Sequence, residues 1–167
     1  MKILSIAVPC YNSQDYMEHC VESLLTGGEK VEIIIVNDGS KDDTAAIADR
    51  LAEKYPTIVK AVHQENGGHG EAVNTGIKNA TGVFFKVVDS DDWVGEEALA
   101  TLLEKLEMFS NSGEDAVNVP DLVLCNYIYD KVGVKHKKVI NYKGYLPLNR
   151  TFTWQDVKKM PPGKYMT

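Results

Sequence analysis

Three carboxylates lie close together in this 167-residue chain, where Asp89, Asp91 and Asp92 follow the apolar run Val83 to Val88. Such a run, short and rich in β-branched and aromatic residues, predicts a central strand buried on both faces of a sheet. Carboxylates this close repel one another unless a cation or a proton intervenes. Hard divalent cations such as Mg²⁺ prefer oxygen ligands and leave room for substrate phosphates. The stretch therefore indicates a metal site, or else acids that favour the start of a helix from Glu96 to Phe109.

Predicted strands and helices alternate along residues 3–110. Strands are expected at four apolar runs, which are Ile3 to Val8, Val31 to Val36, Ile58 to Val62 and Val83 to Val88. Helices are expected after each run, ending at Gly27-Gly28, near Tyr55-Pro56, at Asn79 and at Phe109. Asn12 or Ser13 is expected to cap the first of these helices. Strict alternation is typical of right-handed βαβ units, so the predicted fold class is α/β, a doubly wound, mainly parallel central sheet flanked by helices.

The organisation is expected to change near residue 110. Ser110 to Asp121 is predicted as a loop, Leu122 to Tyr129 as a strand, and Val132 to Tyr142 as one or two antiparallel strands around Gly133. The residues that follow, through to Thr167, show weak periodicity. We expect one continuous domain, with an α/β half at residues 1–110 and the start of a second half at 111–167. A truncated chain fits this C-terminus as well as a natural end does.

Composition excludes several classes of partner. The net charge is −6, and the densest basic run, Lys135 to Lys138, is typical of a solvated loop rather than a nucleic-acid-binding arm. No stretch approaches the roughly 20 apolar residues of a membrane span, and the first apolar run is too short for a signal peptide. Cys10, Cys20 and Cys125 are widely spaced, which argues against a zinc site or a disulfide framework. We therefore expect a cytoplasmic protein that does not bind nucleic acid.

Three polar turns follow three of the predicted strands, at Pro9 to Asn12, Asn37 to Ser40 and Asp89 to Asp92. The carboxyl ends of parallel strands meet at one edge of a sheet, so these turns can share one ligand. The ring of Tyr11 could stack on a nucleobase, and the carboxylate of Asp38 could accept N–H groups from the edge of a base. Each also has a plainer interpretation, since Tyr11 could cover a helix end and Asp38 could simply form its turn.

Four motifs occur in order along the chain. Three of them are Val8-Pro9-Cys10-Tyr11-Asn12, Val36-Asn37-Asp38-Gly39-Ser40 and Asp89-Ser90-Asp91-Asp92, and the remaining one is Glu65-Asn66-Gly67-Gly68 with Ala72, Asn74 and Gly76. Together they resemble the family 2 glycosyltransferases of GT-A fold, over residues 3–110. The resemblance implies a GT-A-like, Rossmann-related sandwich. Residues 1–110 would then be its nucleotide-sugar-binding half, and 111–167 the start of its acceptor-side half.

The resemblance also implies a donor site and a metal site. The residues implied at the donor nucleotide are Pro9, Tyr11, Asn12, Asp38, Gly39, Asn66, Gly67, Asn74, Asp89 and Ser90. Of these, Pro9, Tyr11 and Asp38 are expected to line the pocket for the base and the ribose. Asp89 and Asp91 match the DxD motif of the family, which implies that they bind Mn²⁺ or Mg²⁺ on the diphosphate.

The activity that the resemblance implies is inverting sugar transfer from a nucleoside-diphosphate sugar, with uracil as the expected base because of Asp38. The hydroxyl of a glycan or lipid-linked acceptor would attack the anomeric carbon. The metal would stabilise the leaving diphosphate, and a carboxylate base would take the proton. Cell-surface polysaccharide synthesis at the inner face of the cytoplasmic membrane, with peripheral membrane contact, would fit this activity.

The sequence departs from the family where the catalytic base is expected. After Asp121 the remaining acidic residues are Asp130 and Asp156, and neither sits in a recognisable acceptor-side motif, so the base is unassigned. The alternative function is a non-catalytic nucleotide-binding module of the same fold. A haloacid-dehalogenase-type phosphohydrolase is disfavoured because Trp93 stands where Thr or Val is wanted. A dinucleotide-binding Rossmann domain is disfavoured because Pro9 to Asn12 contains no glycine.

Overall fold

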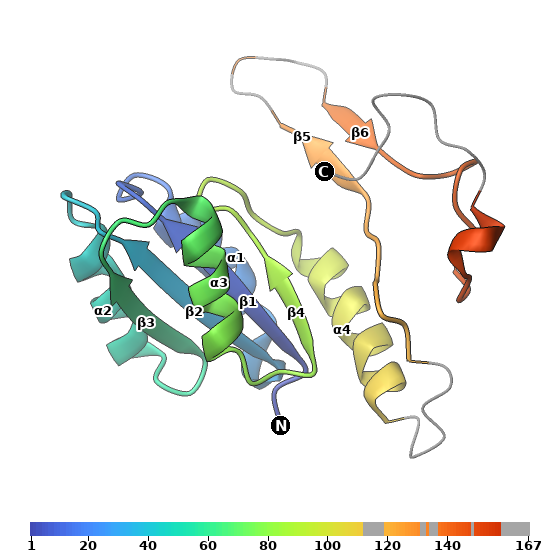
Figure 1. The fold of residues 1–167 in the computed structure, drawn as a ribbon, viewed down its shortest axis with the longest axis horizontal. Coiled ribbons are helices and arrows are strands. Elements are labelled where there is room, and N and C mark those ends of the chain that lie inside the picture. Colours follow the sequence, from blue (N-terminus) through green and yellow to red (C-terminus); the bar gives the residue numbers. More distant parts are fainter. Residues whose placement is uncertain (112–118, 131–132, 134–136, 148, 158–167) are drawn as a thin grey trace. The chain divides into compact units, whose positions relative to one another are not determined.

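The computed structural model of the chain describes residues 1–111, 119–130, 133, 137–147 and 149–157. The chain divides into two compact units, Met1–Gly113 and Glu114–Thr167, both drawn in Figure 1. The first unit contains the alternating strands and helices, and the second contains a small pair of antiparallel strands.

The first unit follows the predicted alternation. Its strands are β1 (Leu4–Cys10), β2 (Val31–Asp38), β3 (Val59–Gln64) and β4 (Phe84–Val87). Its helices are α1 (Met17–Leu25), α2 (Thr44–Lys54), α3 (His69–Asn79) and α4 (Glu96–Ser110), with a 3₁₀ turn, η1, at Gly28–Lys30. The strands form one parallel sheet in the order β3-β2-β1-β4. The predicted α/β class, with a mainly parallel sheet flanked by helices, is confirmed.

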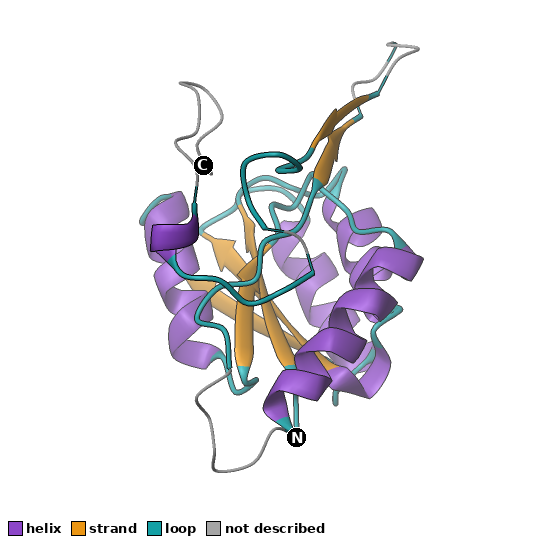
Figure 2. Cartoon of the chain, turned by 90° about the vertical axis from the view of Figure 1, so that its right-hand side faces the viewer, coloured by secondary structure: helices purple, strands orange, loops and turns teal. Residues whose placement is uncertain are grey.

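The strand order decides which face of the sheet each helix covers. From β1 to β3 the chain moves in one direction across the sheet, so right-handed crossovers place α1 and α2 on the same face. Between β3 and β4 the chain reverses, and α3 consequently packs on β1 and β2 from the opposite face. Figure 1 shows α3 in front of the sheet and α1 behind it, and Figure 2 shows helices on both sides. Such a reversal point is where open α/β sheets bind ligands.

The two central strands, β1 and β2, form the middle of the core. Every residue of β1 is buried, and so is every residue of β2 except Glu32. The isoleucines Ile33 to Ile35 are 0% exposed. Ile34 packs with Ala72 of α3. Burial on both faces explains why these strands are continuous apolar runs rather than alternating ones.

Strand β4 differs from the central strand that was predicted at Val83 to Val88. Among the described strands it pairs only with β1, so it lies at the edge of the described sheet. Val83 is 47% exposed and Phe85 is 37% exposed, although Val88, just past the end of the strand, is buried. The prediction of burial on both faces is therefore wrong for this strand. An apolar run indicates a strand, but not how many neighbours cover it.

The second unit contains β5 (Tyr127–Tyr129) and β6 (Lys138–Ile140), which pair in antiparallel fashion. The strand predicted at Leu122 to Tyr129 is thus limited to its last three residues. Of the one or two antiparallel strands predicted at Val132 to Tyr142, β6 is present and pairs with β5. Residues 132 and 134–136 of that prediction lie outside the described residues.

The remaining described part of the second unit has little regular structure. An isolated bridge joins Lys143 to Leu146, and a 3₁₀ turn, η3, follows at Trp154–Asp156. In the part of the chain that the structure describes, no helix has the length and apolar character that crossing a membrane would need.

Candidate functional site

The polar turns predicted from the sequence lie at one edge of the sheet. β1 ends at Cys10, β2 at Asp38, β3 at Gln64 and β4 at Val87. In the parallel register Cys10 lies beside Asn37, and Asp38 lies beside Gln64. The turns that continue from these strands are therefore neighbours, as a parallel sheet requires.

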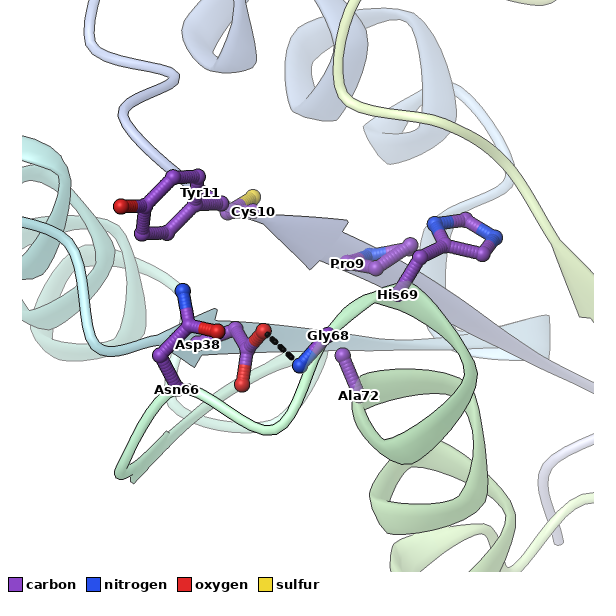
Figure 3. Close-up of a pocket in the computed structure, with 8 residues that line it drawn as sticks. All are labelled: Pro9, Cys10, Tyr11, Asp38, Asn66, Gly68, His69 and Ala72. Carbon is purple, nitrogen blue, oxygen red and sulfur yellow. Dashed lines mark hydrogen bonds between the residues drawn. The ribbon is translucent and has the colours of Figure 1, made fainter.

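A pocket of about 310 Å³ lies between the turns that follow β1, β2 and β3. Its lining residues, drawn in Figure 3, are Pro9, Cys10, Tyr11, Asp38, Asn66, Gly68, His69 and Ala72. Tyr11 is 52% exposed, so the face of its ring is accessible to a flat ligand, whereas Asp38 is 3% exposed. Ligand pockets in proteins begin at about 300 Å³, so this one can hold part of a small molecule.

Asp38 holds the loop between β3 and α3 in place. Its Oδ1 accepts hydrogen bonds from Gly67 N at 2.8 Å and Gln64 Nε2 at 2.7 Å, and its Oδ2 accepts one from Gly68 N at 2.8 Å. Burial alone would raise the pKa of Asp38, but these N–H donors outweigh it and hold the pKa below its ordinary value of 3.8. Asp38 is therefore an anion at neutral pH. Of its roughly four acceptor positions, one on Oδ2 remains for a ligand.

Gly39 allows this loop to pass close to the turn that carries Asp38. Its φ is +68°, in the left-handed region, and a Cβ atom there would lie 2.7 Å from the backbone N of Asn66. Both the torsion and the close approach require glycine. Asn66 and Gly67 are thereby placed against the end of β2, and Asn66 forms part of the pocket wall.

Side-chain hydrogen bonds join the turn after β1 to the turn after β2. Asn12 N donates to Ser40 Oγ at 3.0 Å, and Asn12 Oδ1 accepts from Lys41 N at 2.9 Å. Asn12 adopts a φ of 50° in this arrangement, which asparagine tolerates better than most residues. The predicted cap at Asn12 or Ser13 is wrong, because α1 begins at Met17 and its N-cap residue makes no side-chain hydrogen bond to the helix.

The acidic turn after β4 borders the pocket. His69 lines the pocket, and its Nε2 lies 3.8 Å from Oδ1 of Asp89. Asp89, Asp91 and Asp92 are all exposed. Desolvation by the surrounding protein atoms, together with the negative charges of Asp91 and Asp89, raises the pKa of Asp92, while Lys86 opposes the rise. The repulsion among carboxylates that the sequence indicates is thus present in the fold.

The acidic turn offers the ligand type of a hard divalent cation without a complete coordination shell. Among the described residues, no group of three or more His, Cys, Asp or Glu side chains could hold a metal ion. Cations such as Mg²⁺ are commonly held by one or two carboxylates together with substrate phosphates. Asp89 and Asp91 therefore fit a metal ion as a partial shell that a phosphorylated ligand would complete.

The acidic turn is held against α1 and the turn after β1. Cys20 Sγ donates to the backbone O of Asp89 at 3.6 Å, and Ser13 Oγ lies 2.9 Å from Ser90 Oγ. Burial raises the pKa of the Cys20 thiol to about 12, so the thiol keeps the proton that it donates. These contacts position the backbone from which Asp89 and Asp91 project.

The structure places the predicted site residues in four groups. Those that line the pocket are Pro9, Tyr11, Asp38 and Asn66, and those that support the lining from behind are Asn12, Gly39, Gly67 and Ser90. Asp89 borders the pocket through His69, and Asp91 is exposed on the same turn. Asn74 lies outside the lining, because its Nδ2 donates to Glu71 Oε2 on the exposed side of α3.

Four lining residues are absent from the set implied at the donor nucleotide, namely Cys10, Gly68, His69 and Ala72. Burial raises the pKa of the Cys10 thiol to about 12, so Cys10 is part of the pocket wall rather than a nucleophile. His69 carries a signal in the sequence, since it follows the glycine pair at the start of a helix. Ala72 belongs to the motif that begins at Glu65, and its small size allows α3 to approach β2.

Acid is expected to destabilise the first unit through Asp38. The pKa of this carboxyl is lowered in the folded chain, so the unfolded chain binds the proton first as the pH falls. The stabilisation is fully present above the ordinary value of 3.8 and is lost as the pH falls through the lower folded value. Glu32 and Asp42, whose pKa values are also lowered, add to the effect, whereas Asp92, whose pKa is raised, opposes it. Urea titrations from about pH 6 to about pH 3 should show a falling free energy of unfolding, and a constant value would contradict the role of Asp38.

The chain matches the family model of glycosyl transferase family 2 over residues 5–137. EpsH of Bacillus subtilis (strain 168) is 39% identical over 125 residues, which are 74% of this chain and 33% of EpsH. Glycosyltransferase GlyG of Streptococcus pneumoniae is 38% identical over 133 residues, which are 78% of this chain and 41% of GlyG. The chain therefore spans less than half the length of these curated relatives.

Two solved structures share the fold of the first unit. S. aureus TarS 1-349, in complex with UDP-GlcNAc, superposes with a TM-score of 0.55 at 32% identity, over 66% of this chain and 32% of that chain. The mannosyltransferase PcManGT from Pyrobaculum calidifontis, in complex with GDP-Man and Mn²⁺, gives 0.55 at 25% identity, over 65% and 32%. Since the family match covers most of the chain and every turn around the pocket, this chain belongs to glycosyl transferase family 2.

Proposed function

We propose that the pocket binds the nucleoside of a nucleoside-diphosphate sugar, and that the protein transfers the sugar to an acceptor hydroxyl. The observation that carries the proposal is that the pocket and the acidic turn are neighbours. Tyr11 and Asp38 line the pocket, and His69, which also lines it, lies 3.8 Å from Asp89. A nucleotide lying along this path would have its base near Tyr11 and its phosphates near the acidic turn. The complexes of TarS with UDP-GlcNAc and of PcManGT with GDP-Man and Mn²⁺ support the binding of a nucleotide sugar by this fold.

Uracil is the base that we propose for the donor. Asp38 is an anion with one free acceptor position, which matches the N3–H donor of uracil better than the N3 acceptor of cytosine. The exposed ring of Tyr11 offers a face for stacking on a base. Thymine presents the same N3–H as uracil, and guanine also presents N–H donors, so dTDP and GDP are the competitors against which UDP should be measured.

Asp89 and Asp91 are the residues that would hold Mn²⁺ or Mg²⁺ on the diphosphate. When bound there, the ion would supply Lewis-acid stabilisation of the charge on the departing nucleoside diphosphate. Inverting transfer also needs a carboxylate that takes the proton of the acceptor hydroxyl. Asp130 pairs with Lys137 and Asp156 accepts a hydrogen bond from Thr153 N, and we assign the base to neither.

For the acceptor, we propose a glycan or a lipid-linked sugar at the inner face of the cytoplasmic membrane, in cell-surface polysaccharide synthesis. This part of the proposal rests on family membership alone. Incubating a UDP-sugar and Mn²⁺ with such acceptors, and following UDP release, tests it. A non-catalytic module of the same fold would bind UDP in these experiments and release none from the sugar.

The donor site can be tested by thermal unfolding with UDP, GDP, dTDP and CDP, each with and without Mn²⁺. A ligand at about 100 times its Kd stabilises a protein by roughly 2.7 kcal/mol, which is several degrees for a domain of this size. We expect the largest shift with UDP and Mn²⁺. Asp91→Asn should remove the Mn²⁺-dependent part of that shift, because it weakens the partial metal shell.

The matched control for Asp91→Asn is Glu104→Gln, which removes the same charge from an exposed position on α4. This variant should keep the full shift. A shift that is the same with and without Mn²⁺ would remove the metal from the proposal. The absence of a shift with every nucleotide, in this chain and in a longer chain that contains it, would overturn the donor site itself.

A further inference from the structure

We propose that His63 is a positioning residue for the donor pocket, which acts by fixing the side-chain amide of Asn37 through one imidazole tautomer. The inference deepens the proposed function, since it rests on nucleotide binding beside Asp38. His63 lies outside the pocket lining, so its contribution would pass through the turn at the end of β2 rather than through contact with the nucleotide.

The ring of His63 connects α2 to the end of β2. His63 lies on β3 directly beside Asn37 in the parallel register. Its Nδ1 is 3.0 Å from Asn37 Nδ2, and its Nε2 is 3.0 Å from Oδ1 of Asp49 on α2. Asn37 is 5% exposed as a residue, so each polar atom of its side-chain amide needs a partner within the protein.

The backbone N–H of Ser40 decides the direction of the hydrogen bonds that lead through Asn37 and His63 to Asp49. The N–H of Ser40 can only donate, and it donates to Asn37 Oδ1 at 3.1 Å. The other end of the amide, Nδ2, is therefore a donor that faces His63 Nδ1, and Nδ1 must accept without a proton of its own. The proton of the neutral ring then lies on Nε2, which donates it to Asp49.

These hydrogen bonds end at the turn that carries Asp38, which lines the pocket. Ser40 Oγ accepts a hydrogen bond from Asn12 N at 3.0 Å, so the same turn also holds the turn after β1. Asp38 lies between Asn37 and Ser40, and its backbone is fixed from both sides. Without the Nδ1 acceptor of His63, Asn37 Nδ2 could find another acceptor only if the side-chain amide rotated. Rotation would turn Nδ2, which is a donor, toward the N–H of Ser40, which is also a donor. The disturbance would thus fall on the turn that presents the Asp38 carboxylate.

The test compares His63→Asn with His63→Leu in the full chain, with UDP and Mn²⁺ titrated by calorimetry. Asparagine and leucine have the same branched shape, but only asparagine can place an acceptor, its Oδ1, where Nδ1 of His63 lies. We expect the leucine variant to bind UDP about five-fold more weakly, the worth of one neutral hydrogen bond, and the asparagine variant to bind within about two-fold of the unaltered chain. Equal losses in both variants would overturn the inference.

Two further measurements separate positioning from a general loss of stability. In ¹⁵N–¹H spectra of the imidazole, recorded without nucleotide in mildly alkaline buffer, the His63 proton should lie on Nε2, and a proton on Nδ1 would overturn the inference. Asp49→Asn keeps an acceptor for Nε2–H and should bind UDP like the unaltered chain. If neither the unaltered chain nor a longer chain that contains it bound any nucleotide, the proposed function would fall, whereas normal binding with two equally weak variants would overturn the role of His63 alone.

Discussion

Alanine in place of Asp38 is expected to abolish measurable UDP binding and to lower the free energy of unfolding by about 3 kcal/mol. The change removes the acceptor of three N–H donors, which are Gly67 N, Gly68 N and Gln64 Nε2. Each donor left unsatisfied in a buried place costs about 1–3 kcal/mol, but the glycine loop can turn partly toward water, so the loss is smaller than the sum. Urea unfolding and UDP calorimetry measure the two effects separately.

Asp42→Ala is the matched control, because Asp42 also follows β2 and also accepts backbone N–H groups. Its Oδ2 accepts from Gln14 N at 3.2 Å and its Oδ1 from Thr44 N at 3.0 Å, but it does not line the pocket. The Asp42 variant should lose about 1 kcal/mol and should bind UDP normally. If both variants bound UDP equally well, the pocket that we describe would not be the donor site.

The fold could be predicted from the sequence where local pattern and chain topology agree. Apolar runs at Ile3 to Val8 and Val31 to Val36 indicate strands buried on both faces, and both are central in the sheet. Right-handed crossovers between such strands leave few arrangements to choose from. The run at Val83 to Val88 has the same character, yet β4 lies at the edge of the described sheet. What covers a strand is decided by distant parts of the chain, which a local run does not report.

In the candidate site, too, the sequence pattern predicts which residues lie there but not the contacts that depend on distant parts of the chain. The positions of Tyr11, Asp38 and Asp89 follow from strand ends, because the carboxyl ends of parallel strands meet at one edge. The partners of Asp38 do not follow, since they depend on the left-handed turn at Gly39 and on the path of the loop after β3. His69 reaches the pocket because the strand order places α3 on the far face of the sheet from α1.

Alanine substitutions at two glycines of α3 are expected to change stability in opposite directions. A Cβ on Gly76 would lie 2.4 Å from the Cβ of Ala7 in β1, whereas a Cβ on Gly70 would meet nothing within 4 Å. Alanine is the better helix former by about 1 kcal/mol, so Gly70→Ala should stabilise the chain by about 0.5–1 kcal/mol. At Gly76 the clash with the buried strand exceeds that gain, and we expect a net loss of about 2 kcal/mol.

The Gly76 variant should also weaken UDP binding, because α3 can relieve the clash only by moving away from β1. Such a movement would carry Ala72 and His69, which line the pocket from the same helix. Urea unfolding of the two single variants, followed by UDP titration of each, tests both effects. Stabilisation by Gly76→Ala would contradict the close packing of α3 on β1. Normal UDP binding in a destabilised Gly76 variant would show that the pocket does not depend on where α3 lies.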